Sequence, residues 1–179
     1  MSSTGLIRRA IPSDAARISA LTQSIQALHA HAMPNVFKSA DADTFSTDTV
    51  RQLLAQPESL FLVAVELDSV VGHLYAEVQH LPESAIRYAT SRILVHQLVV
   101  DAPCQRRGIG RQLLHHIRQI AEAQQIPTLV IDVWDFNEPA HAFYRANGYR
   151  DTRHALSLSL EANAPSAQNQ RNERGGSVA

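Results

Sequence analysis

The chain has 179 residues, of which 45% are hydrophobic and 18% charged, and its formal net charge at pH 7 is −1. This length and composition are typical of one globular domain with a sizeable core. The near-zero charge provides no long-range field for nucleic acid or an anionic membrane surface, so we predict neither partner. The lone cysteine, Cys104, excludes an internal disulfide, and the N-terminus lacks the features of a signal peptide. Since no apolar run reaches the ~20 residues that span a bilayer, we predict a cytoplasmic protein.

The hydrophobic periodicity predicts a mixed α+β fold with one central sheet. In chain order, strands are expected at 6–9, 60–66, 70–78, 93–100, 130–133 and 155–160, and helices from about residue 14 and at 47–55, 110–124 and 139–147. Ser13 or Asp14 should cap the first helix, and Thr47 or Asp48 should open the second. We expect one domain over residues 1–161 and a disordered tail over 162–179, where no core-forming residues occur.

Residues 98–111 are the most informative stretch, because a hydrophobic strand leads through a polar turn into a glycine-bearing helix start. Gly108 and Gly110 carry no Cβ to hold a ligand away from the backbone. A helix N-terminus adds unpaired N–H groups and a partial positive charge. Together these features predict a cradle for a phosphate or pyrophosphate at residues 106–111.

The glycine spacing excludes two common nucleotide loops. No Lys-Ser or Lys-Thr follows either glycine, so a P-loop is not supported. Arg111, Gln112 and Leu113 follow Gly110, so the third glycine of a dinucleotide fingerprint is missing. What remains is Gln105-x-x-Gly108-x-Gly110, which resembles the acetyl-coenzyme A loop of the GCN5-related N-acetyltransferase (GNAT) superfamily.

A second stretch resembles the same superfamily. A β-branched strand leads to Asn137, then to a helix with Ala140, Phe143 and Tyr144, and then to Gly148 at the position of a helix C-cap. The superfamily has strand-x-x-x-Asn-x-x-Ala-x-x-Phe-Tyr-x-x-x-Gly-Phe/Tyr at matching spacing. Two motifs in the superfamily's order imply its fold, a mostly antiparallel twisted sheet flanked by helices and splayed in the middle to hold acetyl-CoA.

The resemblance also implies which residues bind acetyl-CoA. By position, the strand before the loop would pair through its backbone with the pantetheine arm, and Asn137 would contact the same arm, although Asn137 could equally be a helix cap. The arginines of the loop could contact the cofactor's phosphates or simply provide surface charge. The implied cofactor-binding residues are Leu98, Val99, Val100, Gln105, Arg106, Arg107, Gly108, Ile109, Gly110, Arg111, Asn137 and Tyr144.

Acetyl transfer to an amine needs a proton donor for the leaving thiolate and a route for the amine proton. Tyr144 matches the superfamily's acid, and an unperturbed phenol, with a pKa of about 10, is protonated at neutral pH. Asp132 lies on the strand before Asn137, where many members carry a Glu base. His96 matches a His of some arylalkylamine acetyltransferases, and an imidazole suits a water-mediated base. Asp132, His96 and bulk water stay open as the base.

The remaining polar residues predict no other chemistry. His29-x-His31 and His115-His116 lack the ligands and spacing of a zinc site, so we predict no metal. Cys104 lacks a neighbouring base, so we expect direct attack on acetyl-CoA without a covalent enzyme intermediate.

The predicted function is therefore acetyl-CoA-dependent N-acetyl transfer to a primary amine of a small molecule or peptide. The alternative is a catalytically inactive acyl-CoA-binding regulator of the same fold. The acceptor cannot be identified from the first helices, the 29–46 loop or the 79–91 connection, although polar residues such as Glu77 could suit an amine. Leu156, Leu158 and Leu160 share one face of the predicted last strand, which would fit a homodimer.

Overall fold

The computed structural model describes residues 5–41, 44–158 and 160, so the predicted disordered tail lies outside the described residues. Contacts divide the chain into two compact units, Met1–Asp132 and Val133–Ala179, and the single domain over 1–161 stays a prediction. The first unit contains β1 (Leu6–Arg9), α1 (Ala15–Ala32), α2 (Thr47–Leu54), β2 (Ser59–Glu66), β3 (Ser69–Leu81), β4 (Thr90–Val100), α3 (Ile109–Ala123) and β5 (Leu129–Ile131). The second unit contains α4 (Glu138–Ala146).

The five strands form one sheet in the order β1-β2-β3-β4-β5, antiparallel except for the last pair. The tight hairpin between β2 and β3 turns through Leu67 and Asp68, both with positive φ, which is the backbone that matches the strand twist. The mixed α+β class and the mostly antiparallel sheet predicted from the sequence are confirmed.

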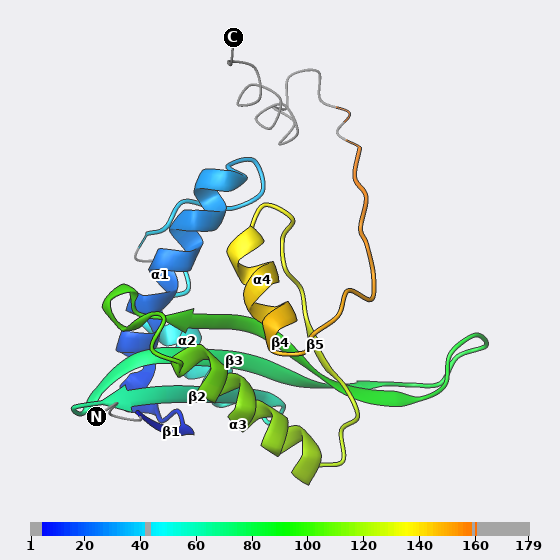
Figure 1. Cartoon of the computed structure of the whole chain (residues 1–179), viewed down its shortest axis with the longest axis horizontal. Helices are drawn as coiled ribbons and strands as arrows, with labels where there is room; N and C mark the ends of the chain where they lie inside the picture. The colour runs from blue at the N-terminus through cyan, green and yellow to red at the C-terminus, as the bar shows by residue number, and fades with distance from the viewer. Residues whose placement is uncertain (1–4, 42–43, 159, 161–179) are drawn as a thin grey trace. The chain divides into compact units, whose positions relative to one another are not determined.

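Helices of the first unit cover both faces of the sheet (Figure 1). On one face, α1 and α2 pack on a core to which Ile18, Val50, Phe61, Val63 and Val99 contribute. On the other face, α3 contributes the fully buried Leu113 and Ile117. The apolar side chains buried on both faces hold the sheet between these helices.

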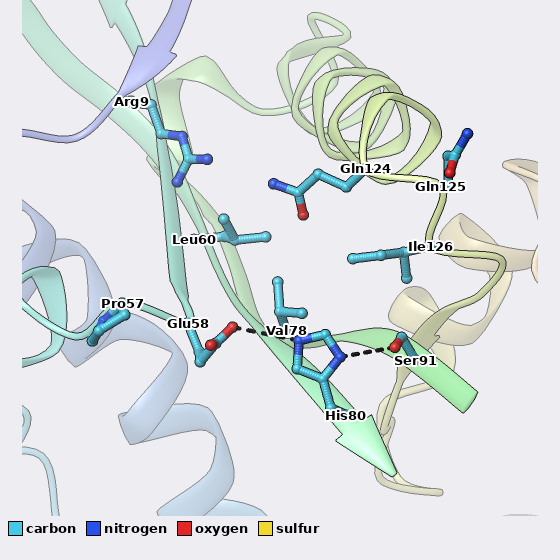
Figure 2. Close-up of a pocket in the computed structure, with 10 residues that line it drawn as sticks. All are labelled: Arg9, Pro57, Glu58, Leu60, Val78, His80, Ser91, Gln124, Gln125 and Ile126. Atoms are coloured by element: carbon cyan, nitrogen blue, oxygen red, sulfur yellow. Dashed lines mark hydrogen bonds and ion pairs between the residues drawn. The ribbon is translucent and has the colours of Figure 1, made fainter. Parts of the chain in front are cut away.

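A polar pocket of about 340 Å³ lies beside the C-terminal end of α3. Arg9 and Gln124 point into it, above a floor to which Leu60 and Val78 contribute (Figure 2). It contains none of the residues predicted to bind acetyl-CoA.

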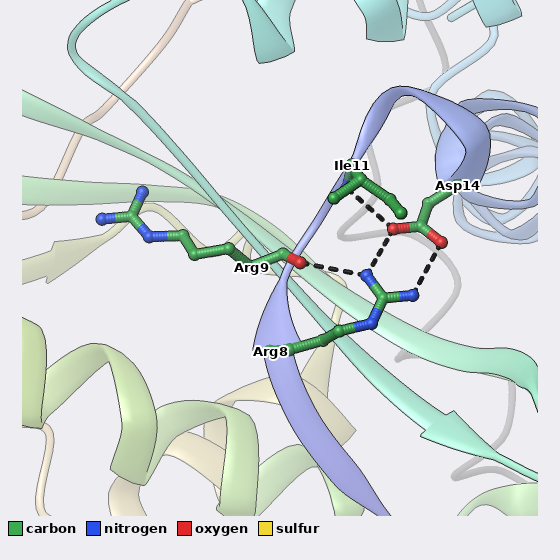
Figure 3. Close-up of polar contacts among 4 residues, drawn as sticks. All are labelled: Arg8, Arg9, Ile11 and Asp14. Atoms are coloured by element: carbon green, nitrogen blue, oxygen red, sulfur yellow. Dashed lines mark hydrogen bonds and ion pairs between the residues drawn. The ribbon is translucent and has the colours of Figure 1, made fainter.

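Asp14 precedes α1 as predicted, but its carboxylate does not cap the helix. Instead it accepts two hydrogen bonds from the Arg8 guanidinium, at 2.6 and 3.0 Å, and one from the backbone N–H of Ile11 at 2.8 Å (Figure 3). The Arg8 guanidinium lowers the pKa of this largely buried carboxyl. A bidentate guanidinium is a stronger partner than a helix N–H, so the carboxylate connects β1 to α1 instead.

The predicted last strand, residues 155–160, is absent from the part of that range that the structure describes, 155–158 and 160. Leu156, Leu158 and Leu160 are almost fully exposed there. Alternating leucines form a strand only where a neighbouring strand takes up the backbone hydrogen bonds, and none of the described strands pairs with this segment. The homodimer stays a prediction.

Candidate active site

The C-terminal half of β4 has an open edge. β5 pairs with β4 at Ile93, Leu94 and Val95, and no described strand continues this pairing along 96–100. On its other side this half stays paired with β3 through Val100. Backbone N–H and C=O groups on the open edge can therefore bind an extended ligand in the manner of an added strand.

The chain beyond β4 forms a loop and a helix start at the residues that were predicted to form an anion cradle. The Gln105 side-chain amide donates to the Val100 carbonyl at 3.0 Å and closes the loop against the strand. Gly108, with φ of +88°, precedes α3, whose first turn closes with the Gln112 N–H donating to the Gly108 carbonyl at 3.0 Å. Helix geometry leaves the N–H groups of residues 109–111 without an intrahelical acceptor. These groups lie next to the end of the open edge.

The space above Gly108 is open. A Cβ at this position would have one neighbour within 4 Å, Arg111 Nη2 at 4.0 Å. Ile109, in contrast, is buried and anchors the start of α3 in the core. A rigid helix start with an uncovered backbone fits a phosphate or diphosphate group.

The arginines of the loop differ in their contacts. Arg107 forms an ion pair with Glu66 at the end of β2, at 3.0 Å, and the Glu66 side chain is 12% exposed. Arg106 and Arg111 are exposed and form no ion pair with any described residue. Arg107 therefore connects the loop to the sheet, whereas the guanidinium groups of Arg106 and Arg111 lack such a partner.

His96 is the extra residue of a β-bulge in β4. Tyr75 of β3 pairs with Gln97 and Ala76 pairs with Val95, so His96 has no partner on β3. A bulge redirects the side chain of its extra residue. The imidazole stacks on Tyr75, with ring centroids 4.8 Å apart and an interplanar angle of 25°.

The His96 imidazole also contacts Glu77, with Nε2 3.3 Å from the carboxylate oxygen Oε2. Both side chains are about one third exposed, so solvent and a ligand can reach them. The structure thus places one of the two predicted base candidates beside a carboxylate at the bulge.

A second histidine, His73 of β3, lies on the same face of that strand as Tyr75 and Glu77, and it is completely buried. Its Nε2 is 3.4 Å from the Gln97 side-chain oxygen and 3.5 Å from Thr22 Oγ1, and Nδ1 has no partner among the described residues. Burial lowers the pKa of His73 from 6.5 to about 4, so the ring is neutral at neutral pH.

Asp132, the other base candidate, follows the last residue of β5. The strand ends at Ile131, two residues before the predicted end, so Asp132 lies in the connection rather than in the strand and is exposed.

In the second unit, Asn137 caps α4, with its side-chain oxygen accepting from the Ala140 N–H at 3.2 Å. Tyr144 is 8% exposed and contacts the rings of Phe143 and Tyr149 edge-on. Burial, and then the charge that Tyr149 would carry, raise the pKa of Tyr144, so the phenol keeps its proton at neutral pH. The C-cap of α4 is Asn147, and Gly148, the predicted C-cap, is the next residue, with φ of +89°.

Within the first unit the structure joins the predicted residues 98–100 and 105–111 in one continuous strand-loop-helix and places His96 two residues before it. Asn137 and Tyr144 share α4 in the second unit. Sequence reasoning missed Tyr75, His73 and Gln97. The spacing His73-x-Tyr75-x-Glu77 on one strand could have indicated a polar face, because alternate residues of a strand share a side.

None of the described helices is long and apolar enough to cross a membrane. No group of three or more His, Cys, Asp or Glu side chains in the described ranges is arranged to hold a metal ion.

Solved structures with the same fold include the BH1408 protein of Bacillus halodurans, as a tetramutant. It shares 24% identity with this chain at a TM-score of 0.83, over 87% of this chain and 99% of that one. A possible acetyltransferase from Clostridium difficile 630 shares 21% identity at a TM-score of 0.68, over 87% and 97% of the two chains. The aminoglycoside N-acetyltransferase AAC(6')-Iy, solved in complex with CoA, shares 13% identity at a TM-score of 0.69, over 86% and 93%.

No curated protein matches the chain. The model of the Acetyltransferase (GNAT) family matches residues 22–149, well over half of the 179 residues. This range includes the bulge, the open edge of β4, the glycine loop and α4. The chain therefore belongs to the GNAT family of acetyltransferases.

Proposed function

We propose that this protein transfers an acetyl group from acetyl-CoA to a primary amine of a small molecule or peptide. The observation that carries the proposal is the open edge of β4 running directly into the Gly108 loop and the N-terminus of α3. An extended arm ending in a diphosphate needs such a combination of a strand edge and an anion cradle. Membership of the acetyltransferase family supports the same donor.

The residues proposed to hold acetyl-CoA are the backbone of Leu98, Val99 and Val100 and the loop from Gln105 to Arg111. Asn137 joins them in the proposal through its side-chain NH₂, since its oxygen already caps α4. Acetyl-CoA supplies the activated acyl group. Because Arg107 is paired with Glu66, we assign the direct phosphate contacts to the N–H groups of the α3 start, Arg106 and Arg111.

The proton transfers are assigned to two side chains, one acid and one base. Tyr144 is the proposed acid for the departing thiolate, since its buried phenol stays protonated. His96 is the preferred base because its side chain is about one third exposed at the bulge of β4, with Asp132 and water as the alternatives. Direct attack by the amine needs no covalent intermediate on the protein.

The acceptor is proposed to be a small-molecule or peptide amine. Several structures of the same fold are aminoglycoside acetyltransferases, one of them solved with sisomicin, so aminoglycosides belong in the first test. Arylalkylamines, polyamines and peptide N-termini complete the panel.

The test combines binding and turnover. Acetyl-CoA at a hundredfold excess over its dissociation constant should stabilise the native state by about 2.7 kcal/mol and raise Tm. Gly110→Glu should abolish this shift by placing a side chain and a negative charge at the cradle, whereas Gln119→Glu, which adds the same charge on the exposed side of α3, should retain it. Release of free thiol that depends on an added amine establishes transfer. Binding without thiol release for every amine class would contradict the transfer and favour the inactive binding protein.

A further inference from the structure

The environment of His96 determines which of its ring nitrogens can accept a proton. We propose that Glu77 is a positioning residue that keeps the imidazole proton on Nε2 of His96 and so presents the Nδ1 lone pair to the acceptor amine. This inference rests on the proposed function in taking His96 as the base.

The first step is the chemistry of the contact. His96 Nε2 lies 3.3 Å from Glu77 Oε2, and an ionised carboxylate accepts hydrogen bonds but cannot donate one. Nε2 must therefore carry the proton. In a neutral imidazole the other nitrogen, Nδ1, is then the acceptor. Nδ1 has no hydrogen-bond partner in the described part of the chain.

The second step is that Glu77 is itself held in place. Arg92 Nε donates to the Gln79 side-chain oxygen at 2.9 Å, which leaves the NH₂ group of Gln79 to donate to Glu77 Oε2 at 3.3 Å. The direction of every hydrogen bond in this series is fixed, because Arg can only donate and a carboxylate can only accept. Arg92 and Gln79 are paired residues of β4 and β3, so the series is part of the sheet.

The third step is the orientation of the ring. Phe61 stacks on Tyr75 with centroids 4.3 Å apart, and Tyr75 stacks on His96 at 4.8 Å. The stack restrains the plane of the imidazole, while Glu77 restrains its rotation within that plane. A base held in both ways loses little freedom when it meets a substrate.

The test is the tautomer of His96, measured by ¹⁵N NMR of the ring nitrogens at a pH where the neutral imidazole predominates. We expect the proton on Nε2 in the wild type. Gln79 and His96 contact the same Glu77 oxygen, Oε2. Glu77→Gln replaces this carboxylate oxygen with an uncharged, weaker acceptor, so we expect the population with the proton on Nδ1 to rise. A wild-type His96 with its proton on Nδ1 would overturn the proposal.

The matched control is a second His–Glu pair of the same sheet. His80 Nε2 lies 4.0 Å from Glu58 Oε2, while its Nδ1 pairs with Ser91 Oγ at 2.8 Å (Figure 2). Glu58→Gln removes a comparable charge and should leave both the His96 tautomer and the acetylation rate unchanged. If Glu58→Gln altered His96 as much as Glu77→Gln does, a general charge effect would replace the proposed contact.

Kinetics separate this proposal from the proposed function. Glu77→Gln should lower kcat/KM about 10-fold or more, less than the 10²–10⁴ that a whole positioned base supplies. The same substitution in a His96→Gln background should cause no further loss, because Glu77 acts through His96. An equal loss in both backgrounds would show that Glu77 acts independently. If no amine is acetylated, the proposed function fails, and the tautomer measurement still tests the contact.

Discussion

Two histidines on the same face of the central sheet have opposite surroundings. His73 is completely buried beside Thr22 and Gln97, and burial keeps it neutral down to about pH 4. His96, on the neighbouring strand, is about one third exposed and lies against Glu77 and Tyr75. A base must be reachable by solvent and able to take up a proton, and of the two histidines only His96 meets these conditions for the proposed base. The predictions below test this division.

The largest effect is expected at Tyr144, where burial has the opposite consequence from burial at His73. Desolvation disfavours the charged form of either group. It therefore lowers the pKa of the His73 imidazole, which loses its proton, and raises the pKa of the Tyr144 phenol, which keeps it. Tyr144→Phe should therefore lower kcat by about 10²–10⁴ with little change in KM for acetyl-CoA. Steady-state kinetics with a good acceptor measure this, with circular dichroism as the check on folding. An unchanged kcat in Tyr144→Phe would show that Tyr144 contributes to packing and not to proton transfer.

The next effect concerns the base. His96→Gln should lower kcat/KM by about 10² and remove the acidic limb of its pH profile, whereas Asp132→Asn should leave that limb in place. The reason is that His96 is restrained beside Glu77, while Asp132 lies beyond the end of β5. If Asp132→Asn removed the acidic limb and His96→Gln did not, Asp132 would be the base. If both variants retained the limb, water would be the base.

For His73 we expect an effect on stability rather than on turnover. The unfolded chain protonates this imidazole below about pH 6.5, but the folded protein does so only near pH 4. The unfolded state therefore binds more protons in this window, and stability falls as the pH drops through it, by roughly 3 kcal/mol at 1.36 kcal/mol per pH unit.

His73→Gln should remove this dependence, which urea unfolding at a series of pH values between 4 and 7 would reveal. His96→Gln serves as the control and should retain the slope. A variant of His73 that unfolds with the same pH dependence as the wild type would show that His73 is protonated equally in both states.

The smallest effect is expected at Gly72, which precedes His73 on β3. A Cβ there would lie 2.9 Å from the Val99 carbonyl, closer than real Cβ atoms approach. Gly72→Ala should push β4 away from β3 and destabilise the protein by about 1–3 kcal/mol. Denaturation monitored by circular dichroism tests this, and an unchanged midpoint would mean that the strands adjust at no cost. Gly148, where a Cβ would meet nothing within 4 Å, offers a comparison at a site without this crowding, although its own φ is positive.

Local chemistry predicted much of the fold from the sequence. The short connection between the predicted strands 60–66 and 70–78, the glycine start of α3 and the positive φ of Gly148 just after α4 each depend on a few neighbouring residues. The placement of Leu98–Val100 directly before the loop follows from the same short stretch.

Features that depend on distant residues were not predicted. The ion pair between Arg107 and Glu66 joins residues 41 positions apart. Ser13 or Asp14 was expected to cap the first helix, but the Asp14 carboxylate contacts Arg8, which belongs to β1 rather than to the helix. The last strand was expected from the leucine alternation at 155–160, but its described residues have no partner strand. In each case the outcome depends on which groups tertiary structure brings together, and the local pattern does not contain that information.

The bulge at His96 divides β4 into two segments, and the alternation of side chains between the two faces of the sheet shifts by one residue from one segment to the next. Before it, the odd-numbered Val95 lies opposite Ala76; after it, the odd-numbered Val99 packs in the core beneath α1. The extra residue lets Val95 and Val99 face opposite layers although their numbers have the same parity. Deleting His96 would remove the imidazole and the bulge together: Val95 and Gln97 would become neighbours, and since they already pair with the neighbouring residues Ala76 and Tyr75, they would keep their faces. The bulge therefore inserts His96 into β4 without changing how the rest of the strand pairs with β3.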